Sequence, residues 1–380
     1  MAANSLQQLQ DHGQSVWLDY IDRTLLVTGR LERMVDAGEV TGVTSNPTIF
    51  QKALATCDEY DATIRSLDAA GRSTLAVWEA LSTGDIAAAA SILAPVYDKT
   101  DGRDGYVSIE VAPSLAHDAD GTIAEARHLF RSLNKPNVMI KVPATSAGVE
   151  ALQELTAEGI NVNSTLIFSV ANYEQVARAY IGGIERLAAQ GRPVSNVASV
   201  ASFFVSRVDS AVDPLLEALV RSAPGGRVAE QAARLLGRTA VANAKIAYET
   251  FLRIFAGEPF ASLRARGARA QRPLWASTST KNPAYRDFYY VEELIGADTV
   301  NTMPPATLDA FRDHGRVRDS LTENVREAHA VVAQLEELGI DLESILGDLQ
   351  KAGVEAFAQS FAALFDCIRE RQVRLRQPQP

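Results

Sequence analysis

The stretch VMIKVPATSAGVEALQELTAEGINVNSTLIF, residues 138–168, decides the fold class. It opens with a short apolar run, Val138–Pro143, and closes with another, Ile160–Phe168. Continuous apolar runs of this length are typical of strands that are buried on both faces of a parallel sheet. Between them lies an amphipathic helical pattern, Gly148–Glu158, with Ser146 as its expected N-terminal cap. A strand, a helix and a second strand in this order predict a parallel α/β fold.

The same alternation continues over most of the chain. The further strand candidates are Ser15–Ile21, Gly42–Asn46, Tyr106–Val111, Val197–Phe204, Pro273–Ser277 and Thr299–Met303. The further helical patterns are Glu59–Leu67, Ser73–Leu81, Ile86–Lys99, Gly121–Leu133, Val170–Ala189 and Val228–Ala256. Strands and helices in this alternation predict an α/β fold of the (β/α)₈ TIM-barrel kind. An open doubly wound sheet is the alternative, but no G-x-G-x-x-G follows any strand, so its dinucleotide-binding version loses support.

We expect one barrel domain over residues 1–370, with extra helices at both ends, and a polar tail over residues 371–380. The stretch Asp213–Gln271 is too long for one barrel helix and should hold at least two. Glu323–Val373 should form further helices that pack across the barrel, and Asp120 should cap the helix that follows it.

Composition excludes several broad classes of protein. The 380 residues are 47% hydrophobic and carry a net charge of −10, which is typical of a soluble globular protein and argues against a general nucleic-acid binder. No run approaches the roughly 18 apolar residues of a membrane span, and the N-terminus does not resemble a signal peptide. The two cysteines, Cys57 and Cys367, lie far apart, as reduced thiols of a cytoplasmic protein would.

Common catalytic motifs do not occur in the chain. It contains no G-x-x-x-x-G-K-[ST] phosphate loop, no H-E-x-x-H and no G-x-S-x-G. The five histidines do not cluster. We therefore expect neither a metal site nor a bound cofactor.

A lysine stands inside the apolar run Val138–Pro143, at Lys141. Lysine is seldom buried without a function or a partner. An amine that loses its solvation inside a barrel stays neutral more often, and a neutral amine can attack a carbonyl carbon to form a Schiff base. The alternative is a lysine at the strand end with its ammonium group in solvent.

Polar residues also lie near the carboxyl ends of the other predicted strands. They are Asp19, Thr44, Asn46, Glu110, Asn163, Thr165, Ser202, Arg207, Ser277 and Lys281. Each one alone would more commonly be a capping or loop residue. In a barrel, however, the carboxyl ends of all strands face one pocket. That pocket would hold a lysine, two carboxylates, hydroxyls, amides and two further cations.

Two long motifs resemble those of the transaldolase family. Gly42–Phe50, with the sequence GVTSNPTIF, resembles the first, and Met139–Val149, with MIKVPATSAGV, resembles the second, which contains the Schiff-base lysine. The similarity continues through residues 163–169 and 202–207 and covers roughly residues 14–370. The resemblance implies a class I aldolase-like barrel. It also implies transfer of a dihydroxyacetone unit between sugar phosphates in the pentose phosphate pathway.

The resemblance also implies a role for each site residue. Lys141 would form the imine, and Asp19 would be the general acid and base for carbon–carbon cleavage. Glu110 and Thr165 would hold the water used when the imine forms and opens. The remaining residues would bind substrate. Asn46 and Asn163 would hold the retained three-carbon fragment, and Thr44 would line the pocket near the imine. Ser202 would hydrogen-bond the substrate, Arg207 would bind the phosphate, and Phe204 and Ser277 would be further substrate-binding residues.

The sequence departs from the family pattern after the seventh strand. Transaldolases usually carry a second phosphate-binding arginine there, whereas this chain reads WASTSTKNP over residues 275–283. This resembles a longer-chain bacterial subgroup that also occurs fused to glucose-6-phosphate isomerase. We assign the phosphate contact to Lys281, which as a point charge lacks the forked geometry of an arginine.

Two other functions stay open. Fructose 6-phosphate aldolases, shorter relatives with the same lysine, carry a tyrosine where this chain has Phe204 and a glutamine where it has Glu110. A sugar-phosphate-binding barrel without catalysis is the second. For all three, small sugar phosphates are the expected partners, with no nucleic acid and no membrane, and the protein would be a monomer or a homodimer.

Overall fold

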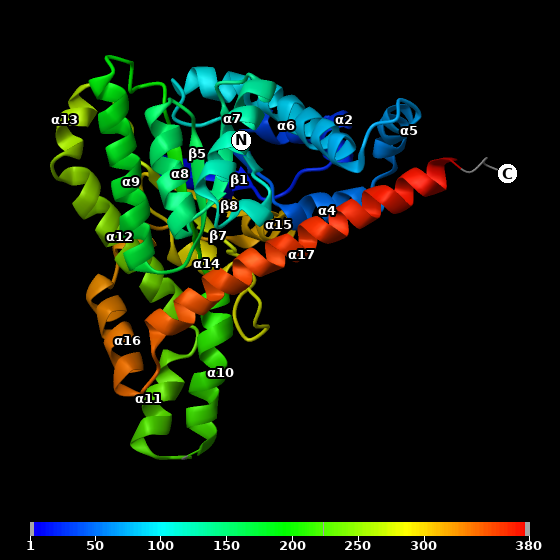
Figure 1. Ribbon diagram of the computed structural model, residues 1–380. Helices are drawn as coiled ribbons and strands as arrows, with labels where there is room; N and C mark the ends of the chain where they lie inside the picture. The colour runs from blue at the N-terminus through cyan, green and yellow to red at the C-terminus, as the bar shows by residue number, and fades with distance from the viewer. Residues whose placement is uncertain (1–3, 223, 377–380) are drawn as a thin grey trace.

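A computed structural model describes residues 4–222 and 224–376 of the chain (Figure 1). Eight parallel strands form one closed barrel in the order in which they occur in the sequence. They are β1 (Gln14–Leu18), β2 (Gly42–Thr44), β3 (Val107–Glu110), β4 (Val138–Pro143), β5 (Val162–Ile167), β6 (Ser199–Phe204), β7 (Arg272–Ala276) and β8 (Thr299–Met303). The predicted (β/α)₈ barrel is therefore confirmed, and the open-sheet alternative is wrong.

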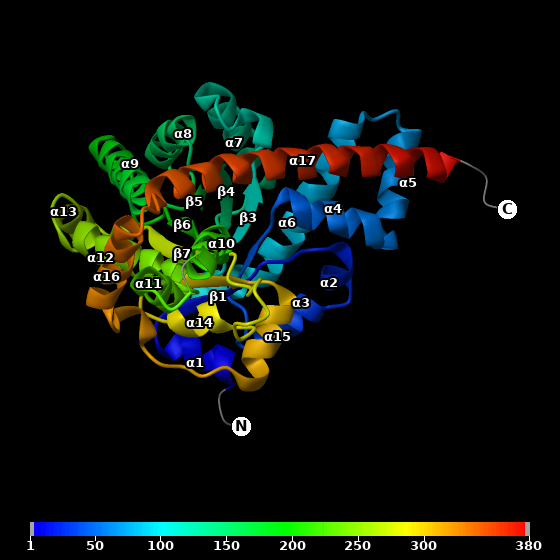
Figure 2. The ribbon, with the colours of Figure 1, turned by 90° about the horizontal axis from the view of Figure 1, so that it is seen from below.

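Helices surround the barrel and extend it at both ends (Figures 1 and 2). The first part of the chain forms α1 (Ser5–Asp11), α2 (Arg23–Val27), α3 (Arg30–Asp36), α4 (Pro47–Thr56), η1 (Asp58–Tyr60), α5 (Asp61–Ala69), α6 (Thr74–Lys99), η2 (Pro113–Leu115), α7 (Ala119–Leu133), α8 (Ser146–Ala157) and α9 (Val170–Ala189). The second part forms α10 (Ser206–Ser222), α11 (Arg227–Leu235), α12 (Thr239–Ala256), α13 (Phe260–Ala265), α14 (Tyr289–Glu293), α15 (Pro305–His314), η3 (Ser320–Thr322), α16 (Val325–Glu337) and α17 (Leu342–Arg376). The expected division of Asp213–Gln271 into several helices is confirmed.

The interior of the barrel is filled by side chains from alternate positions of the strands. Trp17 on β1 faces Gly42 on β2 in register. A Cβ atom at Gly42 would lie 2.5 Å from the Trp17 ring, so the glycine leaves the room that this indole occupies. Trp17 also donates a hydrogen bond from Nε1 to Asp104 Oδ1 at 2.7 Å, which satisfies its only polar atom.

Strand register places three polar side chains in one row inside the barrel. Glu110 on β3 pairs with Lys141 on β4, which in turn pairs with Asn163 on β5. Residues in register on neighbouring parallel strands point to the same face of the sheet. The barrel itself, rather than a loop, therefore holds these three residues together.

The last helix crosses the mouth formed by the carboxyl ends of the strands. Figure 2 shows α17 running from the side of α10 past β5 and α4 towards α5, and these elements contact it. Gln350 anchors it, because Nε2 donates to the carbonyl oxygens of Ala144 at 3.1 Å and Leu166 at 3.0 Å. Gly353 allows close approach, since a Cβ there would lie 2.9 Å from a methyl group of Leu166.

The first part of the expected polar tail over residues 371–380 is helical. The helix α17 continues to Arg376, because Arg371 is buried and holds it against the chain between α4 and α5. The guanidinium of Arg371 donates to Asp61 Oδ1 at 2.5 Å and to the carbonyl oxygen of Cys57 at 2.8 Å. Residues 377–380 lie outside the described part of the chain.

Two expected caps lie one or two residues after the observed ones. The helix α7 is capped by Asp118, which accepts from the Gly121 amide at 3.0 Å, and not by Asp120. The helix α8 is capped by Thr145, which accepts from the Gly148 amide at 3.1 Å, and not by Ser146. In both cases the capping oxygen belongs to the residue three before the amide that it satisfies.

Two expected helices, Ser73–Leu81 and Ile86–Lys99, form one helix, α6. The intervening Asp85 does not end it, because this buried carboxylate accepts from Arg23 Nε at 2.5 Å and from the hydroxyl of Tyr60 at 2.7 Å. Among the described residues, α6 alone is long and apolar enough to cross a membrane by length and composition. Core helices of barrels have the same properties, and α6 packs against α3, α7 and β3.

Candidate active site

A cavity of about 550 Å³ opens at the carboxyl ends of the strands. Most of the predicted site residues line it: Asp19, Thr44, Asn46, Lys141, Ser202, Phe204, Arg207, Ser277 and Lys281. The other three, Glu110, Asn163 and Thr165, lie on the strands β3 and β5 that flank Lys141. The structure therefore gathers residues that are up to 262 positions apart, from Asp19 to Lys281, around one space.

Lys141 lies in the wall of the barrel and is only 4% exposed. Its Nζ atom donates to the carbonyl oxygen of Ser45 at 3.1 Å and lies 3.5 Å from Glu110 Oε2. The ring centroid of Phe357, on α17, lies 5.7 Å from the same atom. The alternative of a lysine with its ammonium group in solvent is therefore wrong.

The Glu110 carboxyl group is buried beside the lysine. Burial raises its pKa from 4.5 to about 7, while the positive charge of Lys141 acts in the opposite direction. Among the described residues, Oε2 has no hydrogen bond that satisfies it, only the longer contact with Nζ. A carboxyl group that titrates near neutral pH can both give and take a proton during a reaction cycle.

Asp19 follows β1 and is held by two neighbouring strands. Its amide donates to the carbonyl oxygen of Met303 at 2.8 Å, and its Oδ1 accepts from the Thr44 hydroxyl at 2.7 Å. Burial raises the pKa of this carboxyl group, whereas Lys141, the Thr44 hydrogen bond and Lys281 lower it. Asp19 and Glu110 thus have different surroundings, which is how two carboxyl groups take different roles in one site.

Amides and hydroxyls form the wall between these charged groups. Asn163 donates from Nδ2 to Ser108 Oγ at 3.0 Å and accepts from Ser202 Oγ at 2.6 Å. Both ends of this amide are therefore fixed. Asn46 accepts from the Ile49 amide at 3.0 Å as the cap of α4, which turns its amide nitrogen towards other acceptors. The hydroxyl of Thr165 is buried and finds no partner in the described part of the chain.

Positive charge gathers at one end of the cavity. The guanidinium carbon of Arg207 lies 5.4 Å from the ring centroid of Phe204, and burial lowers the pKa of this arginine. Lys281 donates to Ser279 Oγ at 2.6 Å, and burial together with Arg207 lowers its pKa. Both cations line the cavity, and the charge of one acts on the pKa of the other, an arrangement that is suited to a dianion such as phosphate.

Ser277 lies between these cations and β7 in an uncommon backbone conformation. Its φ is 55°, in the left-handed region that few residues other than glycine adopt. Its hydroxyl lies 3.0 Å from that of Ser206, at the start of α10. This contact ties the end of β7 to the helix that carries Arg207.

Sequence reasoning missed several residues that line the cavity, among them Tyr20, Lys52, Thr302 and Phe357. Phe357 comes from α17, whose amphipathic pattern does not tell which helix face covers the barrel. Lys52 lies on α4, where a single lysine in a helix carries no special pattern. Thr302 could have been predicted, because it is a polar residue near the carboxyl end of the strand β8, like the site residues predicted on the other strands.

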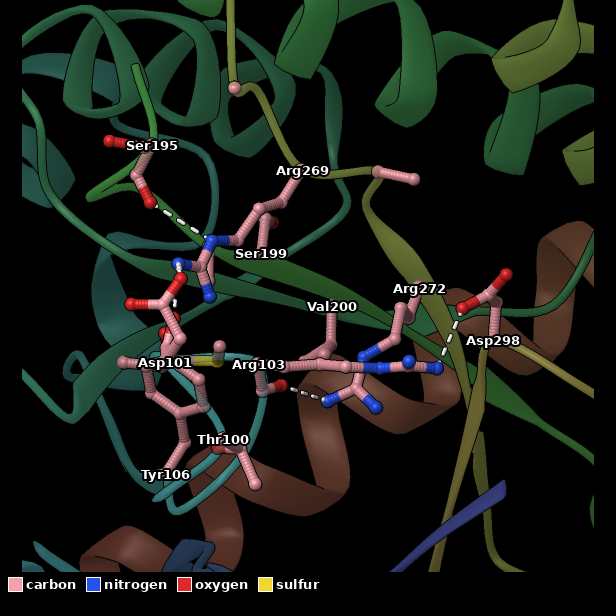
Figure 3. Close-up of a pocket in the computed structure, with 14 residues that line it drawn as sticks. Thr100, Asp101, Arg103, Tyr106, Ser195, Ser199, Val200, Arg269, Arg272 and Asp298 are labelled. Atoms are coloured by element: carbon pink, nitrogen blue, oxygen red, sulfur yellow. Dashed lines mark hydrogen bonds and ion pairs between the residues drawn. The ribbon is translucent and has the colours of Figure 1, made fainter. Parts of the chain in front are cut away.

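A second cavity, of about 450 Å³, lies at the opposite end of the barrel (Figure 3). Three arginines line it, but each is matched by an aspartate. Their ion pairs are Arg103–Asp298 at 2.8 Å, Arg269–Asp101 at 3.7 Å and Arg272–Asp104 at 3.8 Å. Because these charges cancel, and because this end of a barrel usually serves stability, the reactive groups belong to the first cavity.

Metal ligands do not come together in the described residues. No group of three or more histidine, cysteine, aspartate or glutamate side chains there could hold an ion. Cys57 and Cys367 are free thiols. Four of the five histidines pair with carboxylates, for example His128 with Glu79 at 2.5 Å and His329 with Glu249 at 2.7 Å.

The fold and the site together define a (β/α)₈ barrel with a lysine-centred active-site cavity. The model of the family described as Transaldolase/Fructose-6-phosphate aldolase matches residues 16–368. Transaldolase 2 of Nostoc sp. is 43% identical to this chain over 100% of both proteins. Transaldolase 1 of Streptomyces coelicolor is 46% identical over 96% of this chain and 94% of the relative. A transaldolase of Parafrankia sp. is 47% identical over 96% of this chain and 97% of the relative.

The chain therefore belongs to the transaldolase/fructose-6-phosphate aldolase family. The predicted resemblance is confirmed over nearly the whole chain. With it, the expectation of an enzyme of the transferase class, with transaldolase function in carbohydrate metabolism, is confirmed.

Proposed function

We propose that this enzyme transfers a dihydroxyacetone unit through an imine on Lys141. The donor is a ketose phosphate, sedoheptulose 7-phosphate or fructose 6-phosphate, and the acceptor is an aldose phosphate, glyceraldehyde 3-phosphate or erythrose 4-phosphate. The observation that carries the proposal is the position of Lys141 Nζ. This buried amine lies 3.5 Å from Glu110 and lines one cavity with Asp19, Arg207 and Lys281.

Imine formation requires a proton for the oxygen that leaves. The Lys141 amine attacks the ketone carbon of the donor, and the resulting carbinolamine loses water. Glu110 supports this step, because a carboxyl group with a pKa of about 7 can give a proton to the departing hydroxyl and accept one when water returns. The buried hydroxyl of Thr165, which has no hydrogen-bond partner among the described residues, is suited to holding that water.

Carbon–carbon cleavage requires a base on the other side of the imine. The Asp19 carboxylate takes the proton from the donor hydroxyl whose carbon becomes the aldehyde. The bond between that carbon and the fragment breaks, and its electron pair moves into the protonated imine to form an enamine. The aldehyde leaves, a second aldehyde enters, and the enamine attacks it. Asp19 then returns the proton to the new hydroxyl, and water releases the product from Lys141.

Retention of the fragment distinguishes transfer from simple cleavage. The amide groups of Asn46 and Asn163 are suited to holding the hydroxyls of the enamine, since Asn163 is fixed at both ends by Ser108 and Ser202. Arg207 and Lys281 bind the phosphate of donor and acceptor at the far end of the cavity. Binding energy from that phosphate positions the reacting carbon.

Phe204 favours transfer over aldolase activity. Its ring packs against Phe168, with centroids 5.2 Å apart, and offers no hydroxyl to the enamine. Without a proton donor at that position the enamine persists until an aldehyde arrives. A barrel that only binds sugar phosphates would have no need of a buried amine between two carboxyl groups.

The experiment that tests the proposal is borohydride trapping with fructose 6-phosphate, followed by mass analysis of the peptides. Wild type should carry a reduced three-carbon adduct on Lys141, and Lys141→Arg should carry none. A six-carbon adduct without the three-carbon one would retain the imine and contradict cleavage. Folded wild-type protein without any adduct would refute the proposal and favour a binding protein.

As part of the same proposal, the enzyme acts in the cytoplasm as a monomer or homodimer. Its partners are free sugar phosphates, with no cofactor, nucleic acid or membrane. The two free thiols support the cytoplasmic location, and the net charge of −10 argues against nucleic acid as a partner.

A further inference from the structure

A chain of three oxygen atoms ends at Asp19. The hydroxyl of Thr302, on β8, lies 2.6 Å from the hydroxyl of Thr44, on β2. The Thr44 hydroxyl in turn lies 2.7 Å from Asp19 Oδ1. Thr302 is only 3% exposed and reaches the cavity. Thr302 and Thr44 lie on β8 and β2, and Asp19 directly follows β1 between them, so the three oxygen atoms are held by consecutive strands of the closed barrel.

The direction of this chain follows from counting protons. A hydroxyl has one proton to donate and can accept from others. When Asp19 is ionised it can only accept a hydrogen bond, so the Thr44 hydroxyl donates to Asp19 and the Thr302 hydroxyl must donate to Thr44. When Asp19 is protonated it can donate to Thr44, Thr44 then donates to Thr302, and the Thr302 proton turns to the cavity. The same three groups thus satisfy both states of the carboxyl group, with rotation of two hydroxyls and no transfer of a proton along the chain.

We propose that Thr302 is a positioning residue that keeps the Thr44 hydroxyl hydrogen-bonded to Asp19, as donor when that carboxyl group is ionised and as acceptor when it is protonated. This rests on the proposed function, in which Asp19 takes a proton in cleavage and returns it in transfer. In the described residues, the Thr302 hydroxyl bonds to Thr44 and not to Lys141, Arg207 or Lys281. Its effect should therefore fall on the steps that use Asp19 and leave imine formation on Lys141 unchanged.

Loss of the Thr302 hydroxyl should also change the pH dependence. The Thr44 hydroxyl, without its donor, can turn its proton away from Asp19, and that hydrogen bond lowers the pKa of the carboxyl group. The charged groups that face Asp19 are Lys141, Lys281 and Glu110. Arg207, Lys52 and the Tyr20 hydroxyl line the same cavity. All of these remain in a Thr302 variant, so a shift of the acid limb to higher pH would report the hydroxyl chain alone.

The test compares Thr302→Val with Thr302→Ser and with a matched control, Thr156→Val. Thr156 on α8 is buried and its hydroxyl has no partner in the described residues. Its variant therefore makes the same chemical change away from the three hydrogen-bonded oxygen atoms of Thr302, Thr44 and Asp19. The measurements are kcat and KM for fructose 6-phosphate with erythrose 4-phosphate over a pH series, and the ratio of six-carbon to three-carbon adducts trapped on Lys141.

We expect Thr302→Val to lower kcat roughly tenfold, with KM within about twofold, as for loss of one aligned hydrogen bond in the transition state. Its acid limb should move to higher pH, and six-carbon adducts should accumulate because cleavage slows while imine formation does not. Thr302→Ser should restore the wild-type kcat, acid limb and adduct ratio, and Thr156→Val should match wild type in all of them. If Thr302→Val does not fold, Thr302→Ala carries the same test.

The possible outcomes separate this inference from the function on which it rests. Wild-type kcat and pH dependence in Thr302→Val would overturn the role of Thr302, and so would failure of Thr302→Ser to restore activity. Asp19→Asn tests the proposed function itself. If it retained full cleavage, the assignment of Asp19 and with it the proposed function would be wrong. If it lost cleavage while Thr302→Val kept it, only the hydroxyl chain would be wrong.

Discussion

The amine of Lys141 lies 3.5 Å from the carboxyl group of Glu110, and both side chains are only 6% exposed. Neither charge is solvated well, so each depends on the other and on the few dipoles nearby. The contact is longer than a hydrogen bond, which leaves the amine free to react. It leaves the carboxyl group close enough to exchange a proton with a group bound to the amine.

Glu110→Gln should slow imine formation and remove one inflection from its pH dependence. The wild-type carboxyl group has a pKa raised to about 7, so it is protonated below that pH and can act as an acid there. Glutamine cannot give a proton, and we expect a loss of roughly 100-fold, typical of a general acid–base residue. Single-turnover trapping rates from pH 5 to 9 measure it. Glu125→Gln, at a partly buried carboxyl group outside the cavity, is the control, and an inflection near pH 7 that persists in Glu110→Gln would contradict the assignment.

Phe204→Tyr should increase release of free dihydroxyacetone at the expense of transfer. The new hydroxyl would stand in the cavity wall, where it can protonate the enamine before an acceptor arrives. The measurement is dihydroxyacetone formed from fructose 6-phosphate with and without erythrose 4-phosphate. Phe204→Leu removes the ring without adding a proton donor and should not release more. Equal rates of release in the tyrosine variant and wild type would refute this role of Phe204.

Lys281→Ala should raise KM for phosphorylated donors about tenfold, with a smaller loss of kcat, because the lost contact is to the phosphate in ground state and transition state alike. Steady-state kinetics with fructose 6-phosphate measure it, and unphosphorylated fructose should show no such change. Lys351→Ala, at an exposed lysine on α17, serves as the control. Unchanged kinetics in Lys281→Ala would remove this lysine from the site.

Arg371→Ala should destabilise the fold by about 3 kcal/mol, as loss of one partner of a buried ion pair does. The substitution leaves Asp61 and the carbonyl oxygen of Cys57 without their donors. Arg374→Ala is a matched control, since this arginine is 62% exposed and lies 3.7 Å from the same Asp61. It should change stability by less than about 0.5 kcal/mol. Denaturant unfolding of the full chain measures the free energy of unfolding of both variants. Equal effects of the two substitutions would contradict the role of Arg371 in holding α17 against Asp61 and Cys57.

The sequence predicts most of the barrel because its strands are short, apolar and separated by helices. Val138–Pro143 and Thr299–Met303 are observed with the predicted bounds. The features of the fold that the sequence did not predict depend on contacts between segments that are distant in the sequence. Asp85 lies in a stretch that reads as a helix break, yet its bonds to Arg23 and Tyr60 keep α6 continuous.

The candidate site could be predicted for a similar reason. Parallel strands bring their carboxyl ends together, so polar residues at those positions share one cavity, as Lys141 and Asp19 do. Phe357 could not be found in this way, because the face of α17 that meets the cavity is set by anchors such as Gln350 and not by the helix period.

The oxygen chain from Thr302 to Asp19 spans the seam at which the barrel closes, where β8 returns to β1. These strands are the most distant pair in the sequence, and contacts of such long range form slowly during folding. A refolding intermediate that lacks β8 in place would have Lys141 and Glu110 in register but no aligned Asp19. Recovery of transfer activity should therefore follow the last kinetic phase of refolding, whereas imine formation returns with an earlier one.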